Sequence, residues 1–216
     1  MKKYTQEEFD NFSVDENGYK VCPSGDYSGI KEFGDCCIFG DGCCFGEKCR
    51  FGEWCSFGKC CSFGEGCSFG LGCRFDEQCD FGKCCSFGKV CRFGECCRFG
   101  KWCDFGKGCS FCRWCIFCNY CGFGECCEFG RECKIEGIYE LKKLFKAEGL
   151  GSRERMTYFF LLTDGDILVR CGCFLGFIED FEKQVKETHG ESKYAREYLM
   201  CAELAKLHFK GEVACD

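Results

Sequence analysis

The sequence predicts a mainly β protein, in which a solenoid of stacked parallel strands precedes a small α+β C-terminal domain. The first observation is an unbroken six-residue unit, C-x-F-G-x-x, in which cysteine recurs at every sixth position from Cys37 to Cys133. The second is an aromatic residue at every sixth position from Tyr27 to Phe129, with Ile135 closing the series. The third is the loss of this period beyond Ile135. Self-similarity at a fixed period indicates a repeat architecture.

These observations divide the chain into three segments. We expect an N-terminal cap at residues 1–30, a hexapeptide-repeat β-helix at residues 31–135 and the α+β domain at residues 136–216. A cap is expected because the open end of a first coil exposes unpaired backbone groups.

Each hexad is predicted to supply one short strand and one corner. Residues two apart on a strand point to the same face, so the cysteine and the aromatic of C-x-F both point inward. The Gly-x-x segment then turns the corner, because glycine adopts backbone angles that other residues resist. Phe should stack on Phe and Cys on Cys in columns, and a large Phe beside a small Cys keeps the core volume roughly constant. Phe33, near a frayed first coil, should contribute less to stability than Phe87.

Read from the aromatic, the unit F-G-x-x-C-x resembles the hexapeptide repeat of left-handed parallel β-helix proteins. That family places an aliphatic residue first, glycine or a small polar residue second and a small residue fifth. The resemblance implies three hexads per triangular coil, and therefore about six coils that rise about 4.8 Å each. Phe and Cys are departures from the usual fillers of the family. The chain also resembles Cys/Phe-rich hexapeptide proteins of bacteria and phages.

The flanking segments carry local signals. Thr5 with Glu8 fits a capping box for a short helix over residues 6–12. An Asn-Gly pair at residues 17–18 lies between apolar ends and favours a hairpin.

The C-terminal domain is predicted from its turns and its apolar spacing. An Asp-Gly pair between two apolar runs, residues 157–162 and 167–171, predicts a β-hairpin. Apolar residues at helical spacing predict one helix that ends near His189 and a second helix over residues 194–209. Residues 138–145 suit either a helix or an extension of the sheet.

Charge and composition narrow the function classes. The net charge is −6, but the repeats carry acidic and basic residues in equal number, which argues against a DNA mimic. The N-terminus lacks the apolar stretch of a signal peptide, and no apolar run reaches membrane-spanning length. We therefore expect a cytoplasmic protein without a membrane partner. Its 30 cysteines should be buried and reduced, because the repeat explains them better than a disulfide framework does.

An enzyme is not expected. The resemblance brings in acyltransferases and zinc-dependent carbonic anhydrases, which use histidines presented by the solenoid. The two histidines here, His189 and His208, lie outside the repeats, and no loop interrupts the repeats to hold an acyl donor. A Cys–His nucleophile built from Cys171 or Cys173 with His189 is disfavoured, because strand alternation places both sulfurs on the apolar face. We predict no catalytic residue and no cofactor; an acyltransferase is the remote alternative.

The main alternative function is a metal-thiolate or redox protein. Cys112, Cys115, Cys118 and Cys121 are spaced like iron–sulfur or zinc ligands. Cys115 and Cys121 nevertheless occupy the inward slot, whereas Cys112 and Cys118 replace corner glycines and should lie at different corners. Further cysteines that precede an inward cysteine are expected near the surface: Cys36, Cys60, Cys84, Cys96 and Cys126. They lack a nearby histidine or helix N-terminus to lower a thiol pKa.

The favoured function is that of a non-enzymatic solenoid that binds a macromolecule, a protein in preference to a nucleic acid, or forms homo-oligomers. By analogy it is expected to come from a phage or mobile element and to engage a host macromolecule. The candidate binding residues are basic side chains and exposed aromatics, which are favoured binding anchors: Lys83, Lys89, Arg92, Arg98, Lys101, Lys107, Arg113, Trp102, Trp114 and Tyr120.

The corner charges support this choice. They are mostly acidic in the first half of the repeats and basic in the second half. Coils of three hexads would place Lys83 beside Lys101 and Lys89 beside Lys107, and folding gains nothing from such like-charge neighbours. The plain alternative is that these flexible side chains extend separately into solvent.

Overall fold

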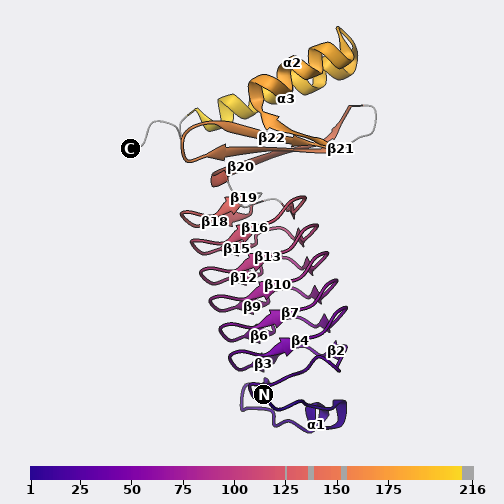
Figure 1. Cartoon of the computed structure of the whole chain (residues 1–216), viewed down its shortest axis with the longest axis vertical. Helices are drawn as coiled ribbons and strands as arrows, with labels where there is room; N and C mark the ends of the chain where they lie inside the picture. The colour runs from indigo at the N-terminus through magenta and orange to yellow at the C-terminus, as the bar shows by residue number, and fades with distance from the viewer. Residues whose placement is uncertain (125, 136–138, 152–154, 211–216) are drawn as a thin grey trace. The chain divides into compact units, whose positions relative to one another are not determined.

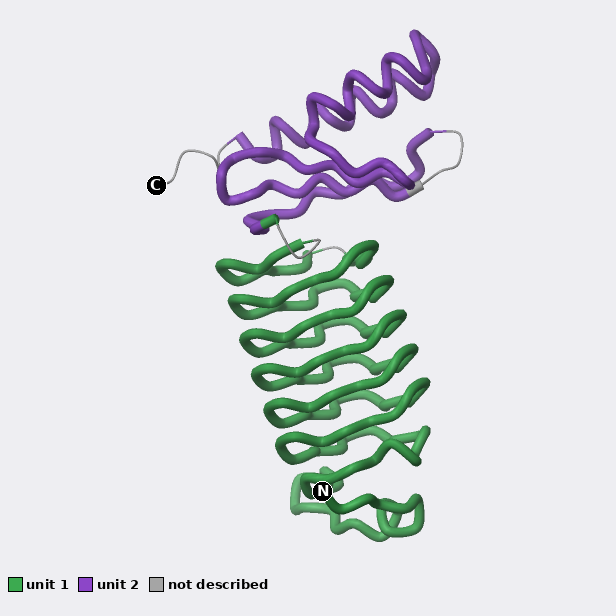
Figure 2. The backbone as a smooth tube through the Cα atoms, viewed as in Figure 1, with its two compact units in different colours: residues 1–139 green, residues 140–216 purple. Residues whose placement is uncertain are grey.

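A computed structural model describes residues 1–124, 126–135, 139–151 and 155–210. The chain forms two compact units, Met1–Tyr139 and Glu140–Asp216, which Figure 2 colours green and purple. Among the helices of the described residues, none combines the length and the apolar character needed to cross a bilayer.

The first unit is a solenoid with three parallel sheets (Figure 1). The first sheet contains, in spatial order, β1 Lys20–Cys22, β3 Cys37–Phe39, β6 Ser56–Phe57, β9 Arg74–Phe75, β12 Arg92–Phe93, β15 Ser110–Phe111 and β18 Glu128–Phe129. The second contains β4 Cys44–Phe45, β7 Ser62–Phe63, β10 Asp80–Phe81, β13 Arg98–Phe99, β16 Ile116–Phe117 and β19 Lys134–Ile135. The third contains β2 Glu32–Phe33, β5 Arg50–Phe51, β8 Ser68–Phe69, β11 Ser86–Phe87, β14 Asp104–Phe105 and β17 Gly122–Phe123.

Register partners on adjacent strands lie three hexads apart, as in the pairing of Ser86 with Asp104 and of Phe87 with Phe105. This pairing confirms the predicted mainly β solenoid of about six coils. Because the repeat period is even and the strands are in register, each column contains one residue type over many coils.

Phenylalanine rings fill the interior. The Phe87 ring stacks on Phe69 at a centroid distance of 4.9 Å and on Phe105 at 4.8 Å. It also meets Phe81 and Phe93 edge-on, each at 5.0 Å. Offset stacks within a column and edge-to-face contacts between columns are the geometries that aromatic quadrupoles favour.

The cysteine thiols fill the remaining space beside the rings. Cys73 donates its thiol to the Gly52 carbonyl at 3.4 Å, and Cys103 donates to the Gly82 carbonyl at the same distance. Both side chains are fully buried. The described cysteines are free thiols, as the repeat predicts.

The corners do not use glycine for the predicted reason. The hexad glycine is not left-handed; the residue two positions later is, as at Lys48 (φ 57°) and Trp54 (φ 58°). The glycine is instead required for space, because a Cβ on Gly88 would lie 2.6 Å from the carbonyl carbon of Gly70 in the preceding coil. Close stacking of backbones, rather than the bend, therefore selects glycine.

The N-terminal segment closes the first coil. Helix α1, Gln6–Asp10, has the predicted capping box, but it ends before Phe12. Its Phe9 ring lies edge-on to Phe33 at 5.1 Å, so Phe33 is buried and not frayed. The Asn-Gly turn is closed by a single bridge between Val14 and Lys20. Since β1 pairs with β3, the parallel stack begins within the predicted cap.

The second unit is an α+β domain, as predicted. Its antiparallel strands are β20 Tyr139–Leu150, β21 Arg155–Leu162, β22 Ile167–Cys171 and β23 Phe174–Phe177, and its helices are α2 Ile178–His189 and α3 Lys193–Phe209. The ambiguous segment 138–145 is a strand from residue 139 onward, and residue 138 lies outside the described residues. Phe159 and Val169 from the sheet pack with Phe181 and Ala202 from the helices in a common core.

Candidate binding surface

The corners of successive coils form three edges along the solenoid, which we define by the residue two positions after each strand aromatic. Edge 1 follows the second sheet and contains Glu47, Glu65, Lys83, Lys101 and Asn119. Edge 2 follows the third sheet and contains Asp35, Glu53, Leu71, Lys89 and Lys107. Edge 3 follows the first sheet and contains Asp41, Lys59, Glu77, Glu95, Arg113 and Arg131.

Backbone hydrogen bonds fix the spacing along each edge. On edge 1, Gly66 N–H donates to the Lys83 carbonyl at 2.8 Å and Cys84 N–H donates to the Lys101 carbonyl at 2.9 Å. On edge 2, Val90 N–H donates to the Lys107 carbonyl at 2.9 Å. Neighbours on an edge are therefore about one strand spacing, ~4.8 Å, apart.

Edge 3 contains two ion pairs between successive coils. Lys59 Nζ lies 3.2 Å from a Glu77 carboxylate oxygen, and Arg113 Nε lies 2.9 Å from a Glu95 oxygen. These are exposed ion pairs, each of which contributes at most about 1 kcal/mol. Their arrangement nevertheless shows that opposite charges one coil apart can meet.

Arg113 and Trp114, two predicted binding residues, are therefore engaged within edge 3. The guanidinium carbon of Arg113 lies 4.6 Å from the centroid of a Trp114 ring. The indole N–H of Trp114 donates to a Glu132 carboxylate oxygen at 2.6 Å. These contacts separate both residues from the rest of the predicted binding set.

Edge 1 instead segregates its charges, and edge 2 places Asp35 and Glu53 before Lys89 and Lys107 in the chain. On edge 1, Glu47 and Glu65 are adjacent, and Lys83 and Lys101 follow. Among the described residues, no carboxylate lies within ion-pair distance of Lys83 or Lys101. Two unit charges about 5 Å apart repel by about 1 kcal/mol even in water. The predicted like-charge neighbours are thus present on adjacent coils, with their backbones one strand spacing apart.

Exposed aromatics extend edge 1 beyond its lysines. The Trp102 and Tyr120 rings stack at a centroid distance of 4.3 Å and an interplanar angle of 12°. They are 56% and 44% exposed. Trp102 directly follows Lys101, so edge 1 presents two cations followed by an aromatic pair.

Two of the predicted arginines, Arg92 and Arg98, lie on sheet faces and not on edge 1. Arg92 pairs in register with Arg74 on the first sheet, and Arg98 pairs with Asp80 on the second. Sequence reasoning missed Arg74, although its place one coil before Arg92 in the same slot was a sufficient signal. Of the predicted set, the structure brings together Lys83, Lys101, Trp102 and Tyr120 on edge 1, and Lys89 and Lys107 on edge 2.

The cysteine run 112–121 does not converge on one site. Cys115 donates its thiol to the Gly94 carbonyl at 3.3 Å, and Cys121 donates to the Gly100 carbonyl at 3.4 Å, both inside the solenoid. Cys112 is exposed on one corner and Cys118 is half-buried on the next. Across residues 1–210, apart from the undescribed positions, no group of three or more His, Cys, Asp or Glu side chains could hold a metal ion.

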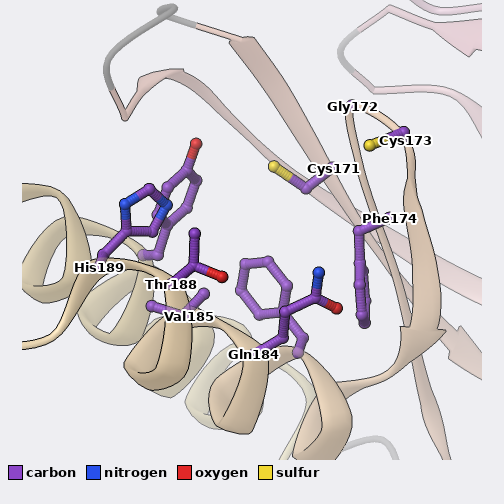
Figure 3. Close-up of a pocket in the computed structure, with 10 residues that line it drawn as sticks. Cys171, Gly172, Cys173, Phe174, Gln184, Val185, Thr188 and His189 are labelled. Atoms are coloured by element: carbon purple, nitrogen blue, oxygen red, sulfur yellow. The ribbon is translucent and has the colours of Figure 1, made fainter.

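The second unit contains a pocket of about 200 Å³ between the β22–β23 turn and α2 (Figure 3). His189 lines it from the helix, and its ring stacks on Tyr198. Cys171 lines the strand side, where its sulfur accepts a hydrogen bond from the Thr157 hydroxyl at 3.3 Å. The expectation that Cys173 faces the core is wrong: β22 ends at Cys171, and Cys173 is exposed in the turn.

No protein-family model, curated protein or solved structure matches this chain.

Proposed function

We propose that the chain is a binding protein whose solenoid presents edge 1 to an acidic macromolecular partner. The observation that carries this proposal is the stacking of Lys83 on Lys101 beside the exposed Trp102–Tyr120 pair. Edge 3 shows the contrasting arrangement, in which opposite charges compensate one another within the chain.

An acidic partner would relieve the repulsion between the lysines and cover the aromatic rings. Aromatic anchors beside a complementary charge are typical of energetically important interface residues. A protein fits better than a long nucleic acid, because the same edge continues into Glu65 and Glu47, which would repel an extended phosphate backbone. The partner therefore carries a short acidic segment and not a continuous polyanion.

The proposal is tested by fluorescence anisotropy of a labelled poly-glutamate peptide and of a labelled DNA duplex. The parent chain should bind the peptide more tightly than the duplex, and raising the salt concentration should weaken both complexes. Lys83→Glu combined with Lys101→Glu should weaken peptide binding at least tenfold.

The matched control combines Lys183→Glu with Arg196→Glu, two exposed positions on α2 and α3 that give the same change in net charge. This control should bind the peptide like the parent. Equal binding by the parent and the edge 1 variant at low salt would show that edge 1 is not the binding surface.

A further inference from the structure

The outward residues of the third sheet form a face between edges 1 and 2, which we call the serine face. It consists of Glu32, Arg50, Ser68, Ser86, Asp104 and Gly122. Each of its strands β5, β8, β11 and β14 begins after an edge 1 residue and ends before an edge 2 residue. The two edges with segregated charges thus border the same face.

The charges of both edges reverse at nearly the same height. Edge 1 reads acid, acid, base, base, with its centre midway between Glu65 and Lys83. The described positions of edge 2 read acid, acid, Leu71, base, base, and their midpoint is Leu71. The centre of edge 1 lies at position 74 and that of edge 2 at position 71, a difference of three residues. Since a coil of 18 residues rises ~4.8 Å, the two centres differ in height by about 0.8 Å.

We infer that the serine face and its two edges bind a second copy of this chain in antiparallel orientation. The two copies are related by a two-fold axis that runs across the face at the height of the charge reversal. Such an axis places each edge against the same edge of the second copy, running in the opposite direction. Glu47 therefore faces Lys101 of the second copy, and Glu65 faces Lys83. This inference rests on the proposed function, because it names the acidic partner of edge 1.

Edge 2 becomes complementary under the same axis. Glu53 faces Lys89 of the second copy, and Leu71 faces its own counterpart. One rotation therefore matches both edges, as a self-complementary isologous interface requires.

The centre of the face permits close approach. Ser68 and Ser86, the two residues nearest the axis, have short side chains. On edge 1, Lys48, which follows Glu47, faces the exposed Trp102 of the second copy, and this arrangement suits a cation–π contact.

The same edge charges disfavour a parallel arrangement. An axis along the solenoid would bring edge 1 against edge 2 at equal heights. Glu47 would then meet Glu53, and Lys83 would meet Lys89, so these pairs of edge charges would repel. The antiparallel dimer is the arrangement that the charges favour.

The inference is tested by sedimentation velocity of the full chain and of two variants. The first variant, Lys83→Glu with Lys101→Glu, makes the charged positions of edge 1 entirely acidic. The second, Glu47→Lys with Glu65→Lys, makes them entirely basic. The parent should dimerise at low salt and dissociate as salt is added. Each variant alone should dimerise at least tenfold more weakly, and an equimolar mixture should regain the dimer.

The charge swap separates this inference from the proposed function. A parent that stays monomeric at low salt, or a mixture that does not regain the dimer, overturns the antiparallel dimer. If such a monomer still binds poly-glutamate through Lys83 and Lys101, the proposed function stands. If each variant loses the dimer, their mixture regains it and the parent does not bind poly-glutamate, the inference is supported. Edge 1 would then recognise a second copy of the chain alone.

Discussion

Replacing Phe87 by alanine removes one ring from the middle of the solenoid, with a cost that follows from its surroundings. Phe87 contacts Phe69 and Phe105 above and below at 4.9 and 4.8 Å and four further rings edge-on, two at 5.0 Å and two at 5.8 Å. These neighbours cannot collapse into the cavity, because backbone hydrogen bonds hold the coils about 4.8 Å apart. We therefore expect the upper end of the usual range for Phe→Ala, about 4–5 kcal/mol.

Phe129 in the last coil provides the matched control. It is half-buried, and its described ring contacts are with Phe111, Phe117 and Phe123 of the preceding hexads, at 5.2, 5.8 and 5.2 Å. Phe129→Ala should therefore cost about half as much, roughly 2 kcal/mol. Urea unfolding followed by far-ultraviolet circular dichroism gives both free energies, provided that the m-value is unchanged. Equal costs at the two positions would refute the stacked-column argument.

Two further predictions concern the thiols. Under native conditions a thiol reagent should modify exposed cysteines such as Cys60, Cys84 and Cys173 quickly and leave inward cysteines such as Cys103 unmodified; rapid labelling of every cysteine would contradict a closed interior. Alkaline pH should destabilise the solenoid, because the hydrogen bond with the Cys121 thiol and burial raise the pKa of Cys103 to about 12. An unfolded thiol has a pKa of about 8.5, so this stability is fully present below that pH and is lost as the pH rises toward 12, by about 1.4 kcal/mol per pH unit for each such thiol. Urea midpoints that stay constant from neutral pH to pH ~10.5 would contradict this pKa shift.

The repeat region could be predicted in detail because its physical rules are local. The six-residue period determines which side chain points inward, so the alternation of Cys and Phe was sufficient to predict the stacked columns. The role of the hexad glycine was predicted wrongly, since its constraint comes from the coil beneath it and not from its own backbone angles. Such a contact joins residues 18 positions apart, as Gly88 with Gly70, and cannot be deduced from a single hexad.

The ends and the surface were harder to predict. Packing of Phe9 on Phe33 depends on the tertiary placement of a five-residue helix, for which the sequence has no periodic signal. Strand β23 was missed because it follows β22 after only two residues. On the surface, the prediction that Lys83 and Lys101 lie on adjacent coils was correct. The ion pair between Arg113 and Glu95 was missed, because it requires knowledge of which edge each residue occupies.

The register of three hexads also determines how the chain tolerates insertions and deletions. Removing 18 residues, such as 73–90, would delete one whole coil and leave every remaining side chain on its original face. Removing six residues would keep the interior intact but move every later residue to the next face. The lysines at positions 83 and 101 would then leave the edge that holds the glutamates at positions 47 and 65. Length changes of both kinds preserve the core, but only whole-coil changes preserve the assignment of residues to the three surfaces.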